Sequence, residues 1–528
     1  MEIGVDVGTT VTKAVAFDDQ GRQVGEASRP TRLVRPGPGR FEHDTDEIVA
    51  SVNEVIAELV HRLGGDRGAG RGSDGSAGEA RRSAAGGAGP TSSSFGGEAG
   101  AAGEPVSLVA ITGQGDGLWL VDEAGRPVRP AISWLDARSS SILGRWTDSG
   151  VAEQVFRRSG NRMFPGASGP LLAAVLEEEP DTLTRATTAA YCKDVVMQRL
   201  TGVRATDISD ASAPFLDPRT GDYDAEALSA CGLSDWRHLL APVAPDGPVG
   251  ELHDASIGLP KGTRVSSGPY DLPAAAIGAG VTEVGDALLT VGTTLACQVV
   301  TRDLPVDGEP AGLILGTWTP GVWLRAMPAM VGTAALDRVL HLVGATTDQL
   351  QQLLTDSPPG ANGVTVLPYL SEAGERAPFV DTNARGTFDG ISLSTTQGDL
   401  LRATCEGIAY AARHCLEAAG WSGKVTVCGG GARSNEWTQI LADVLDAPLH
   451  TTEASQVAAR GAVIAAKRVL GDVGAEWIAE TRQIDPDPTR AAFYAEGYAH
   501  YLRRIEAARP RWADPAPAYQ AATLPAPA

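Results

Sequence analysis

The segment VDVGTT at residues 5–10 ends an apolar strand at a glycine and leads into the next strand. The same pattern returns in the second half of the chain as LTVGTT at residues 289–294. A Gly-Thr-Thr turn offers unhindered backbone N–H groups and two hydroxyls, which suit phosphate oxygens. One such turn could be a simple tight β-turn, because short Gly-Thr motifs are common. Its duplication predicts a repeated fold whose paired turns face a shared polyphosphate.

The residues around the first turn predict an α/β fold. Residues 2–29 alternate short apolar runs with breaks, which indicates an antiparallel group of strands. An apolar stripe at helical spacing follows, with Asp44 and Glu47 placed as an N-terminal capping pair. An apolar strand is expected at residues 106–112, and strands and helices alternate along most of the remaining chain.

The length of the chain predicts two domains with a cleft between them. A chain of 528 residues is too long for one hydrophobic core. We expect an N-terminal domain over residues 1–272 and a C-terminal domain over residues 273–513. Between about residues 63 and 105 the sequence is almost entirely Gly, Ala, Ser and Arg, which predicts a disordered insertion in a surface loop. The Pro/Ala-rich residues 514–528 predict a flexible tail.

Composition restricts the classes of partner. The formal net charge of -21 argues against broad binding to a nucleic acid, because affinity for phosphate backbones depends on clustered Lys and Arg. The six cysteines are scattered without metal-ligand spacing, so neither a disulfide framework nor a zinc site is expected. No apolar segment is long enough to cross a bilayer, and the chain has no apparent signal peptide. A cytoplasmic protein without a membrane partner is therefore expected.

The first Gly-Thr-Thr turn carries groups that the second one lacks. Asp6 stands where the second copy has Thr290, so only the first turn offers a carboxylate to a hard cation such as Mg²⁺, most simply through its water shell. Lys13 lies in the same hairpin and is expected to reach a phosphate. The first turn is thus the candidate site for the metal and the charged end of the ligand.

Two further segments are candidate ligand sites. The glycines of CGGGARSN at residues 428–435 would let the backbone approach a flat ligand closely, although a sharp strand-to-helix turn with Ser434 as N-cap explains them equally well. SSGPYDLP at residues 266–273 holds Asp271 in a rigid Gly/Pro context. This carboxylate could accept a proton from a hydroxyl, or it could bond its own backbone in a turn.

Together these segments resemble the FGGY family of carbohydrate kinases, which includes xylulokinases and glycerol kinases. The similarity covers nearly the whole chain apart from the insertion and the tail, and the ordered set of blocks is far more specific than any one block. The blocks are GVDVGTTVTKAV (4–15), ITGQGDGLWLVDEAGRPVRPAISWLDARS (111–139), KDVVMQRLTG (193–202), TDISDAS (206–212), GPYDLPAAAIGAG (268–280), VGTT (291–294), LPYLSEAGERAPFVDTNARGTFDGI (367–391), RATCEGIA (402–409) and GGGARSNEW (429–437).

The resemblance implies an α/β fold of two actin-like (ribonuclease H-like) domains, each with a mixed sheet, around an interdomain cleft. It also implies a kinase that uses ATP and Mg²⁺ to phosphorylate a hydroxyl of a small sugar or polyol, such as xylulose, erythritol or glycerol. Asp6 would stand near Mg²⁺. The residues expected to contact ATP are Thr9, Thr10, Lys13, Gly292, Thr293, Gly430, Gly431 and Asn435.

The resemblance also implies the acceptor site. Asp271 occupies the position of the catalytic base, which takes the proton from the acceptor hydroxyl as it attacks the γ-phosphorus. The acceptor pocket is expected to involve Gln114, Gly115, Asp116, Asp271 and Leu272. A carboxylate at Asp116 suits vicinal hydroxyls, the defining feature of a polyol or open-chain sugar.

A departure from the family pattern bears on the acceptor, and one charged turn is interpreted as structural. Many xylulokinases carry Met-His where this chain has Gly115-Asp116, so the resemblance leaves the acceptor open. The Gly374-Glu375-Arg376 turn is interpreted as structural, with a buried ion pair rather than a contact to substrate.

The same fold would also serve a protein that binds nucleotide without transferring phosphate, such as an actin-like ATPase or a sugar-sensing regulator. Asp271 together with the polar segment at Gln114 favours the kinase. We expect the acceptor mainly on the N-terminal domain and ATP mainly on the C-terminal domain, with closure bringing Asp271 to the γ-phosphate. The oligomeric state is open, and a homodimer is one option.

Overall fold

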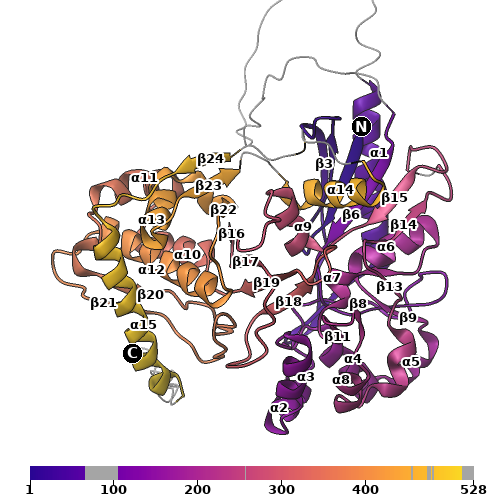
Figure 1. Ribbon diagram of the computed structural model, residues 1–528, viewed down its shortest axis with the longest axis horizontal. Helices are drawn as coiled ribbons and strands as arrows, with labels where there is room; N and C mark the ends of the chain where they lie inside the picture. The colour runs from indigo at the N-terminus through magenta and orange to yellow at the C-terminus, as the bar shows by residue number, and fades with distance from the viewer. Residues whose placement is uncertain (66–104, 256, 453–455, 473–476, 478–480, 514–528) are drawn as a thin grey trace, which may run out of the picture.

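The computed structural model describes residues 1–65, 105–255, 257–452, 456–472, 477 and 481–513. The tail expected at 514–528 lies outside these residues, as does nearly all of the insertion expected at 63–105. Residues 63–65 differ from the prediction because they complete a helix. Figure 1 shows two α/β halves, one formed mainly by the first part of the chain in indigo to pink and the other by the later part in orange to yellow.

The first half is built on a six-stranded mixed sheet in the order β14-β15-β6-β1-β2-β3. β1 pairs antiparallel with β2 and parallel with β6, and β6 pairs parallel with β15. The predicted antiparallel start and the predicted strand near residues 106–112 are confirmed. The strands are β1 (Glu2–Val7), β2 (Val11–Phe17), β3 (Gln23–Pro30), β6 (Leu108–Gly113), β14 (Val249–Glu251) and β15 (Arg264–Ser267).

The second half is built on a seven-stranded sheet in the order β18-β19-β17-β16-β22-β23-β24. Here β16 pairs antiparallel with β17 and parallel with β22, as β1 does with β2 and β6. The duplication predicted from the two Gly-Thr-Thr turns is therefore confirmed. The strands are β16 (Ala287–Val291), β17 (Leu295–Thr301), β18 (Leu313–Gly316), β19 (Trp323–Pro328), β22 (Val425–Cys428), β23 (Leu449–Thr452) and β24 (Thr481–Ile484).

Helices and short strands complete both halves. The helices are α1 (Thr45–Gly65), α2 (Ser140–Asp148), α3 (Val151–Ser159), α4 (Ser168–Glu178), α5 (Pro180–Arg185), α6 (Cys192–Thr201), α7 (Ile208–Ala211), α8 (Ala225–Ala230), α9 (Asp271–Gly278), α10 (Thr333–Val343), α11 (Thr347–Asp356), α12 (Gln397–Ala418), α13 (Asn435–Leu445), α14 (Val457–Val469) and α15 (Ala491–Ala513). The short strands are β4 (Val34–Gly37), β5 (Arg40–His43), β7 (Trp119–Val121), β8 (Ala131–Ile132), β9 (Thr188–Ala190), β10 (Thr206–Asp207), β11 (Leu216–Asp217), β12 (Asp222–Tyr223), β13 (Val243–Ala244), β20 (Thr365–Leu367) and β21 (Thr387–Asp389), and the 3₁₀ turns are η1 (Ser234–Leu239), η2 (Ala361–Gly363) and η3 (Gly430–Arg433). None of the described helices is long and apolar enough to cross a membrane.

Helix α1 begins where the sequence predicts and packs its apolar stripe on β2 and β3. The Asp44 carboxylate accepts hydrogen bonds from the backbone N–H groups of Asp46 (2.9 Å) and Glu47 (3.1 Å), which satisfies donors that the first helical turn leaves free. The Glu47 carboxylate does not complete the expected capping pair, because it accepts from the Arg32 guanidinium instead.

Helix α14 belongs to the later part of the chain but packs on the first sheet, where Figure 1 shows it beside β6 and α9. Its small side chains lie against apolar residues of β2 and β6. A Cβ atom at Gly461 would lie 1.8 Å from the Ala274 carbonyl oxygen, and one at Gly278 would lie 1.9 Å from the Val457 carbonyl oxygen. The backbones of α9 and α14 therefore touch at two glycines, and α14 determines where α9 lies.

Gly461→Ala is expected to lower the free energy of unfolding by about 1–3 kcal/mol, because the added methyl group overlaps backbone atoms that cannot rotate away. Denaturant unfolding followed by circular dichroism measures the change. Gly144→Ala in α2 is the control, since nothing lies within 4 Å of its Cβ position and alanine favours a helix. Equal stability of the Gly461→Ala protein and the wild type would contradict the close crossing.

Candidate active site

The candidate catalytic acids lie at one edge of the first sheet, where three mutually parallel strands end. Asp6 lies near the end of β1, Gln114 and Asp116 follow β6, and Asp271 follows β15. The carboxyl ends of neighbouring parallel strands share one edge, where α/β folds commonly bind ligands. Residues far apart in the sequence are brought together there, as predicted.

The carboxylates of this edge influence one another. Burial raises the pKa of Asp271 to about 8, and the negative charges of Asp6 and, to a smaller extent, Asp116 add to this effect. Burial raises the pKa of Asp116 to about 7, although the Arg376 guanidinium opposes the rise. Burial likewise raises the pKa of Asp6 to about 6, opposed by Lys13. Perturbed carboxylates gathered in this way are typical of sites that transfer protons.

Asp271 is the first residue of α9, and the Leu272 backbone N–H donates to its carboxylate. A helix N-terminus favours a negative charge, so the ionised form of Asp271 has support even though burial opposes it. The preceding loop is fixed to β6, because the Thr112 hydroxyl donates to the Pro269 carbonyl oxygen at 2.7 Å. The carboxylate is thus held at a defined place and can act as a general base.

A chain of hydrogen bonds joins the first Gly-Thr-Thr turn to the predicted acceptor segment. Trp134 Nε1 donates to the Thr9 hydroxyl at 2.9 Å, and this hydroxyl donates to Gln114 Oε1 at 3.1 Å. The Gln114 amide then approaches His43 Nε2 at 3.5 Å. The Thr9 and Gln114 side chains therefore hold each other in this conformation.

The other predicted phosphate residues of the hairpin differ in their surroundings. Thr10 is exposed at the tip of the turn. Lys13 Nζ donates to Gln456 Oε1 at 3.1 Å, and Gln456 directly precedes α14. Lys13 also lies near enough to Asp6 to lower the pKa of that carboxyl. The lysine thus links the first hairpin to α14.

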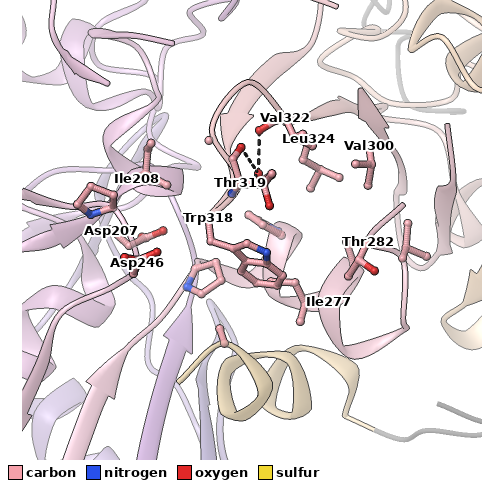
Figure 2. Close-up of a pocket in the computed structure, with 18 residues that line it drawn as sticks. Asp207, Ile208, Asp246, Ile277, Thr282, Val300, Trp318, Thr319, Val322 and Leu324 are labelled. Carbon is pink, nitrogen blue, oxygen red and sulfur yellow. Dashed lines mark hydrogen bonds between the residues drawn. The ribbon is translucent and has the colours of Figure 1, made fainter. Parts of the chain in front are cut away.

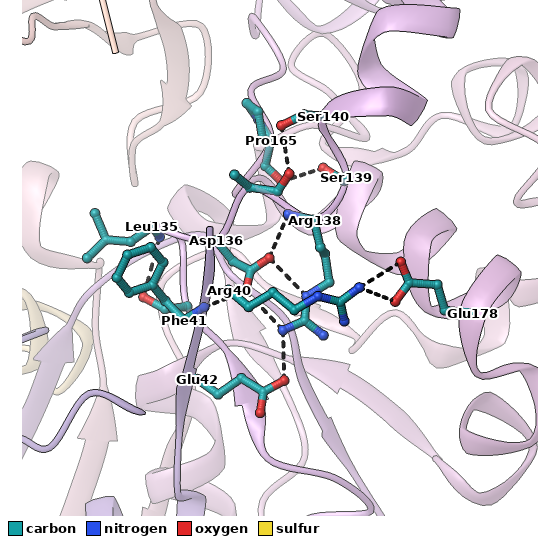
Figure 3. A network of polar contacts seen from close by, with 12 residues as sticks. Arg40, Phe41, Glu42, Leu135, Asp136, Arg138, Ser139, Ser140, Pro165 and Glu178 are labelled. Atoms are coloured by element: carbon teal, nitrogen blue, oxygen red, sulfur yellow. Dashed lines mark hydrogen bonds and ion pairs between the residues drawn. The ribbon is translucent and has the colours of Figure 1, made fainter. Parts of the chain in front are cut away.

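Buried charges hold the segment that carries Trp134. Figure 3 shows Asp136 and Arg138 at the centre of a network with Glu42. Asp136 Oδ2 also accepts from the Phe41 backbone N–H at 2.7 Å. Asp136 and Arg138 have side chains 0% and 1% exposed, so each charge is compensated within the protein. Trp134 is therefore presented to the site from a rigid loop.

The glycine-rich elements of the second half also meet at one sheet edge. β16 and β22 are parallel neighbours, and the turns that follow them are in contact. A Cβ atom at Gly431 would lie 2.4 Å from Val291 Cγ1, and one at Gly429 would lie 2.6 Å from the Val291 carbonyl oxygen, next to Gly292. Only glycine allows such an approach, while Gly430 faces open space.

The neighbouring helix starts line the same edge. The Thr293 carbonyl oxygen accepts from the Ala334 N–H in the first turn of α10. Ser434 caps α13 by accepting from the Trp437 N–H, so the N-cap suggested by the sequence is confirmed. Asn435, the first residue of α13, accepts a hydrogen bond from Arg482 at 3.2 Å. Gly292, Thr293, Gly430, Gly431 and Asn435 are thus gathered on two adjacent turns.

The structure corrects the prediction for Glu375 and Arg376, which do not form a buried ion pair. Glu375 Oε1 accepts from the Met330 N–H at 2.7 Å and from the Arg376 N–H at 2.8 Å, so it braces the backbone. The Arg376 guanidinium instead extends to the first half, where it lies 5.7 Å from the Trp134 ring centroid. Sequence reasoning missed this position because nothing in the GERAPF segment shows which way the arginine points.

Metal binding at this edge requires a ligand in addition to the protein. Among the described residues, no three His, Cys, Asp or Glu side chains are grouped closely enough to hold an ion. Mg²⁺ usually keeps several waters and is held by one or two carboxylates together with substrate phosphates. The half-buried Asp6 carboxylate, whose pKa is raised by burial, fits that donor set.

A separate cavity of about 620 Å³, counting the part open to solvent, lies between the two halves beside α9. Figure 2 shows its lining, which includes Ile208, Asp246, Ile277, Trp318 and Leu324. The lining is mostly apolar and contains none of the candidate catalytic, nucleotide or acceptor residues. The acids at the strand ends and this cavity are therefore distinct features.

The chain is similar in sequence and fold to known sugar and polyol kinases. The chain is 31% identical to the erythritol kinase of Brucella abortus over 97% of this chain and 96% of that protein. It is 32% identical to the xylulose kinase of Streptomyces rubiginosus over 89% and 88%. The crystal structure of xylulose kinase from Rhodospirillum rubrum superposes with a TM-score of 0.81 at 27% identity, covering 97% of this chain and 99% of that chain.

These comparisons establish the fold class. The ligand-bound xylulose kinase from Lactobacillus acidophilus, at 22% identity, superposes with a TM-score of 0.82 over 97% of this chain and 99% of that chain. The predicted α/β fold of two actin-like domains, each with a mixed sheet, is confirmed. Residues 1–68 and 94–278 match the N-terminal domain of the FGGY family of carbohydrate kinases, and residues 288–469 match its C-terminal domain. The chain therefore belongs to the FGGY family of carbohydrate kinases.

Proposed function

We propose that the protein transfers the γ-phosphate of ATP to a hydroxyl of a small open-chain sugar or polyol, with Asp271 as the general base. The observation that carries this proposal is the position of Asp271 at the start of α9, beside Asp6 and Asp116 at the ends of three parallel strands. Phosphoryl transfer mainly requires alignment of the hydroxyl, phosphorus and leaving oxygen, together with charge compensation. Asp271 would accept the hydroxyl proton during attack.

The acceptor side is assigned to the first half. Asp116 and Gln114 offer oxygens to hydroxyl donors, and Gly115 lets the Tyr270 ring approach, since a Cβ there would lie 2.5 Å from the ring. Leu272 gives the pocket an apolar surface next to Asp271. The similar proteins include an erythritol kinase and xylulose kinases, so four- and five-carbon acceptors are the first candidates.

The nucleotide side is assigned to both glycine-rich edges. Thr9, Thr10 and Lys13 would hold phosphates from the first hairpin, and Gly292 and Thr293 would hold them from the second. Gly430, Gly431 and Asn435 would lie against the adenosine. Asp6 would help hold Mg²⁺, which supplies compensation for phosphate charge when it is bound with ATP.

The two halves are proposed to act as domains, over residues 1–272 and 273–513, that close on their ligands. Closure would bring the nucleotide to Asp271 and exclude water. We place the protein in the cytoplasm, because ATP is available there and all six cysteines are free and buried. For its assembly, a homodimer is one option.

Asp271→Asn is expected to lower kcat by about 10²–10⁴-fold, because the amide cannot accept the hydroxyl proton. ATP affinity should change little, as measured by titration calorimetry. Asp122→Asn is the control, since the Asp122 carboxylate accepts only from Ala124 and Arg126 of its own surface turn, so this variant should retain full turnover. Wild-type turnover in the Asp271→Asn protein would refute the assignment of the base.

The same substitution is expected to stabilise the ligand-free protein at high pH. The pKa of Asp271 is about 8 in the folded protein against an ordinary value of 3.8, so the folded state binds more protons than the unfolded state between these values. By linkage, this group makes the free energy of unfolding fall as pH rises through that window. Asp271→Asn should therefore be more stable than wild type at about pH 8 and should lose this advantage towards about pH 4, as measured by denaturant unfolding. An advantage that did not depend on pH would contradict the raised pKa.

The proposed activity is tested by coupled ADP release with tetritols, pentitols, ketopentoses, glycerol and sugar acids. A kinase accelerates ADP release only when a suitable acceptor is added, and we expect the largest acceleration with a four- or five-carbon polyol or ketose. ADP release that ignores every acceptor would instead identify a non-transferring ATPase or a regulator.

A further inference from the structure

Arg376 of the second half and Asp116 of the first half carry opposite charges but do not form a direct ion pair. Arg376 comes from the segment between β20 and β21 of the second half, and Asp116 comes from the loop after β6 of the first half. A Cβ atom at Gly117, the residue after Asp116, would lie 3.3 Å from the Trp134 backbone nitrogen, and the Arg376 guanidinium lies over the Trp134 ring, so both groups lie beside Trp134. The Arg376 charge also opposes the rise in the pKa of Asp116. Among the described residues Arg376 forms no ion pair with a carboxylate. Asp116 and Arg376 therefore approach the same tryptophan from different halves without a direct ion pair.

Arg376 is oriented by contacts that leave its outer N–H groups available. Its Nε donates to the Pro328 carbonyl oxygen at 2.7 Å. Its guanidinium carbon lies 5.7 Å from the Trp134 ring centroid and 5.6 Å from the Phe164 ring centroid. Such a cation–π arrangement fixes the plane of the guanidinium. One edge of the fork is used by Pro328, and the described residues offer no partner for the other edge.

Asp116 carries an unsatisfied acceptor in the loop that packs beside Trp134. Its Oδ1 is buried and accepts no hydrogen bond from any described residue. Its backbone has φ of 55°, in the left-handed region that residues other than glycine rarely adopt. Strain of this kind is typical of functional positions. A buried oxygen without a donor is costly, so a ligand that donates to it would be strongly favoured.

We propose that Asp116 and Arg376 together bind one hydroxyl group of the acceptor, which donates its hydrogen to Asp116 and accepts an N–H from Arg376. A hydroxyl group can donate to a carboxylate and accept from a guanidinium at the same time. Trp134 would form the floor beneath the acceptor carbon that carries this hydroxyl, since its ring already lies below the guanidinium. This assignment rests on the proposed kinase function and adds Arg376 to the acceptor site.

The pairing also has a consequence for closure. The two partners belong to different halves, so an acceptor that bridges them would favour the closed state through contacts that neither half makes alone. Acceptor binding and domain closure would then be coupled. An acceptor without the bridging hydroxyl would bind weakly. It would also leave the two halves open, so that ATP stays accessible to water.

Steady-state kinetics with whichever of erythritol, glycerol, xylitol and xylulose gives the highest kcat/KM tests the pairing. Arg376→Ala is expected to raise the acceptor KM by about 10- to 100-fold, because it removes a hydrogen bond from a charged donor, while the KM for ATP changes less than about twofold. Arg376→Lys should recover part of this loss, since it keeps the charge but not the fork. Arg385→Ala is the matched control, because Arg385 donates only to backbone carbonyl oxygens of the same segment.

Deoxy acceptors distinguish binding from a structural role. For the analogue that lacks the bridging hydroxyl, wild type and Arg376→Ala should have the same KM, and Asp116→Asn combined with Arg376→Ala should cost less than the sum of the single changes. The inference fails if Arg376→Ala lowers the thermal midpoint but leaves the acceptor KM and the discrimination against deoxy analogues unchanged. That outcome leaves the kinase assignment intact, whereas absence of acceptor-dependent ADP release in the wild type would refute the proposed function itself.

Discussion

The close crossing of α9 and α14 is the contact on which the geometry of the site depends. Asp271 begins α9, and Gln456, the partner of Lys13, immediately precedes α14. The two helices meet backbone to backbone at Gly278 and Gly461. A base and a candidate phosphate ligand on different loops are therefore held relative to each other by one rigid contact. The last part of the chain must dock on the first sheet before this arrangement exists.

The site concentrates negative charge that the folded protein alone does not neutralise. Burial raises the pKa values of Asp6, Asp116 and Asp271. Lys13 opposes the rise only at Asp6, and Arg376 opposes it only at Asp116. Such an arrangement weakens the ligand-free fold, and stability lost at active sites is a common counterpart of activity. Ligands that bring hydroxyl donors or a divalent cation would relieve this cost, so binding energy and catalytic competence have the same electrostatic origin.

The sequence predicted the backbone framework of the site well, because that framework follows from local patterns. The duplicated Gly-Thr-Thr turns, the strand before Asp271 and the Ser434 cap all depend on residues close together in the chain. The prediction that Glu375 and Arg376 pair failed for the opposite reason. The Glu375 carboxylate accepts hydrogen bonds from backbone N–H groups, and the Arg376 guanidinium packs on aromatic rings of the other half. Neither contact can be predicted from the residues next to Glu375 and Arg376 in the sequence.

Contacts between distant segments also changed the interpretation of single side chains. The Thr9 hydroxyl was expected to meet phosphate, yet Trp134 and Gln114 already engage it in this conformation. Gln456 and α14 could not be assigned to the first half by position alone, because they lie between β23 and β24 of the second half. The order of elements along the chain predicts the fold, but it does not predict which half a late helix joins.

The proposed acceptor side combines groups from both halves of the molecule. Near the end of β15, the buried Lys193 ammonium lies 2.6 Å from Asp194, 2.9 Å from Asp207 and 3.1 Å from Asp210, and the Ser267 hydroxyl donates to Asp194. These ion pairs brace the end of β15 and hence the loop that leads to the candidate base, because removing one partner of a buried ion pair is strongly destabilising. Arg376, in contrast, belongs to the other half. If Asp271 is the base, its fixed loop would let the acceptor be aligned without requiring the whole site to move.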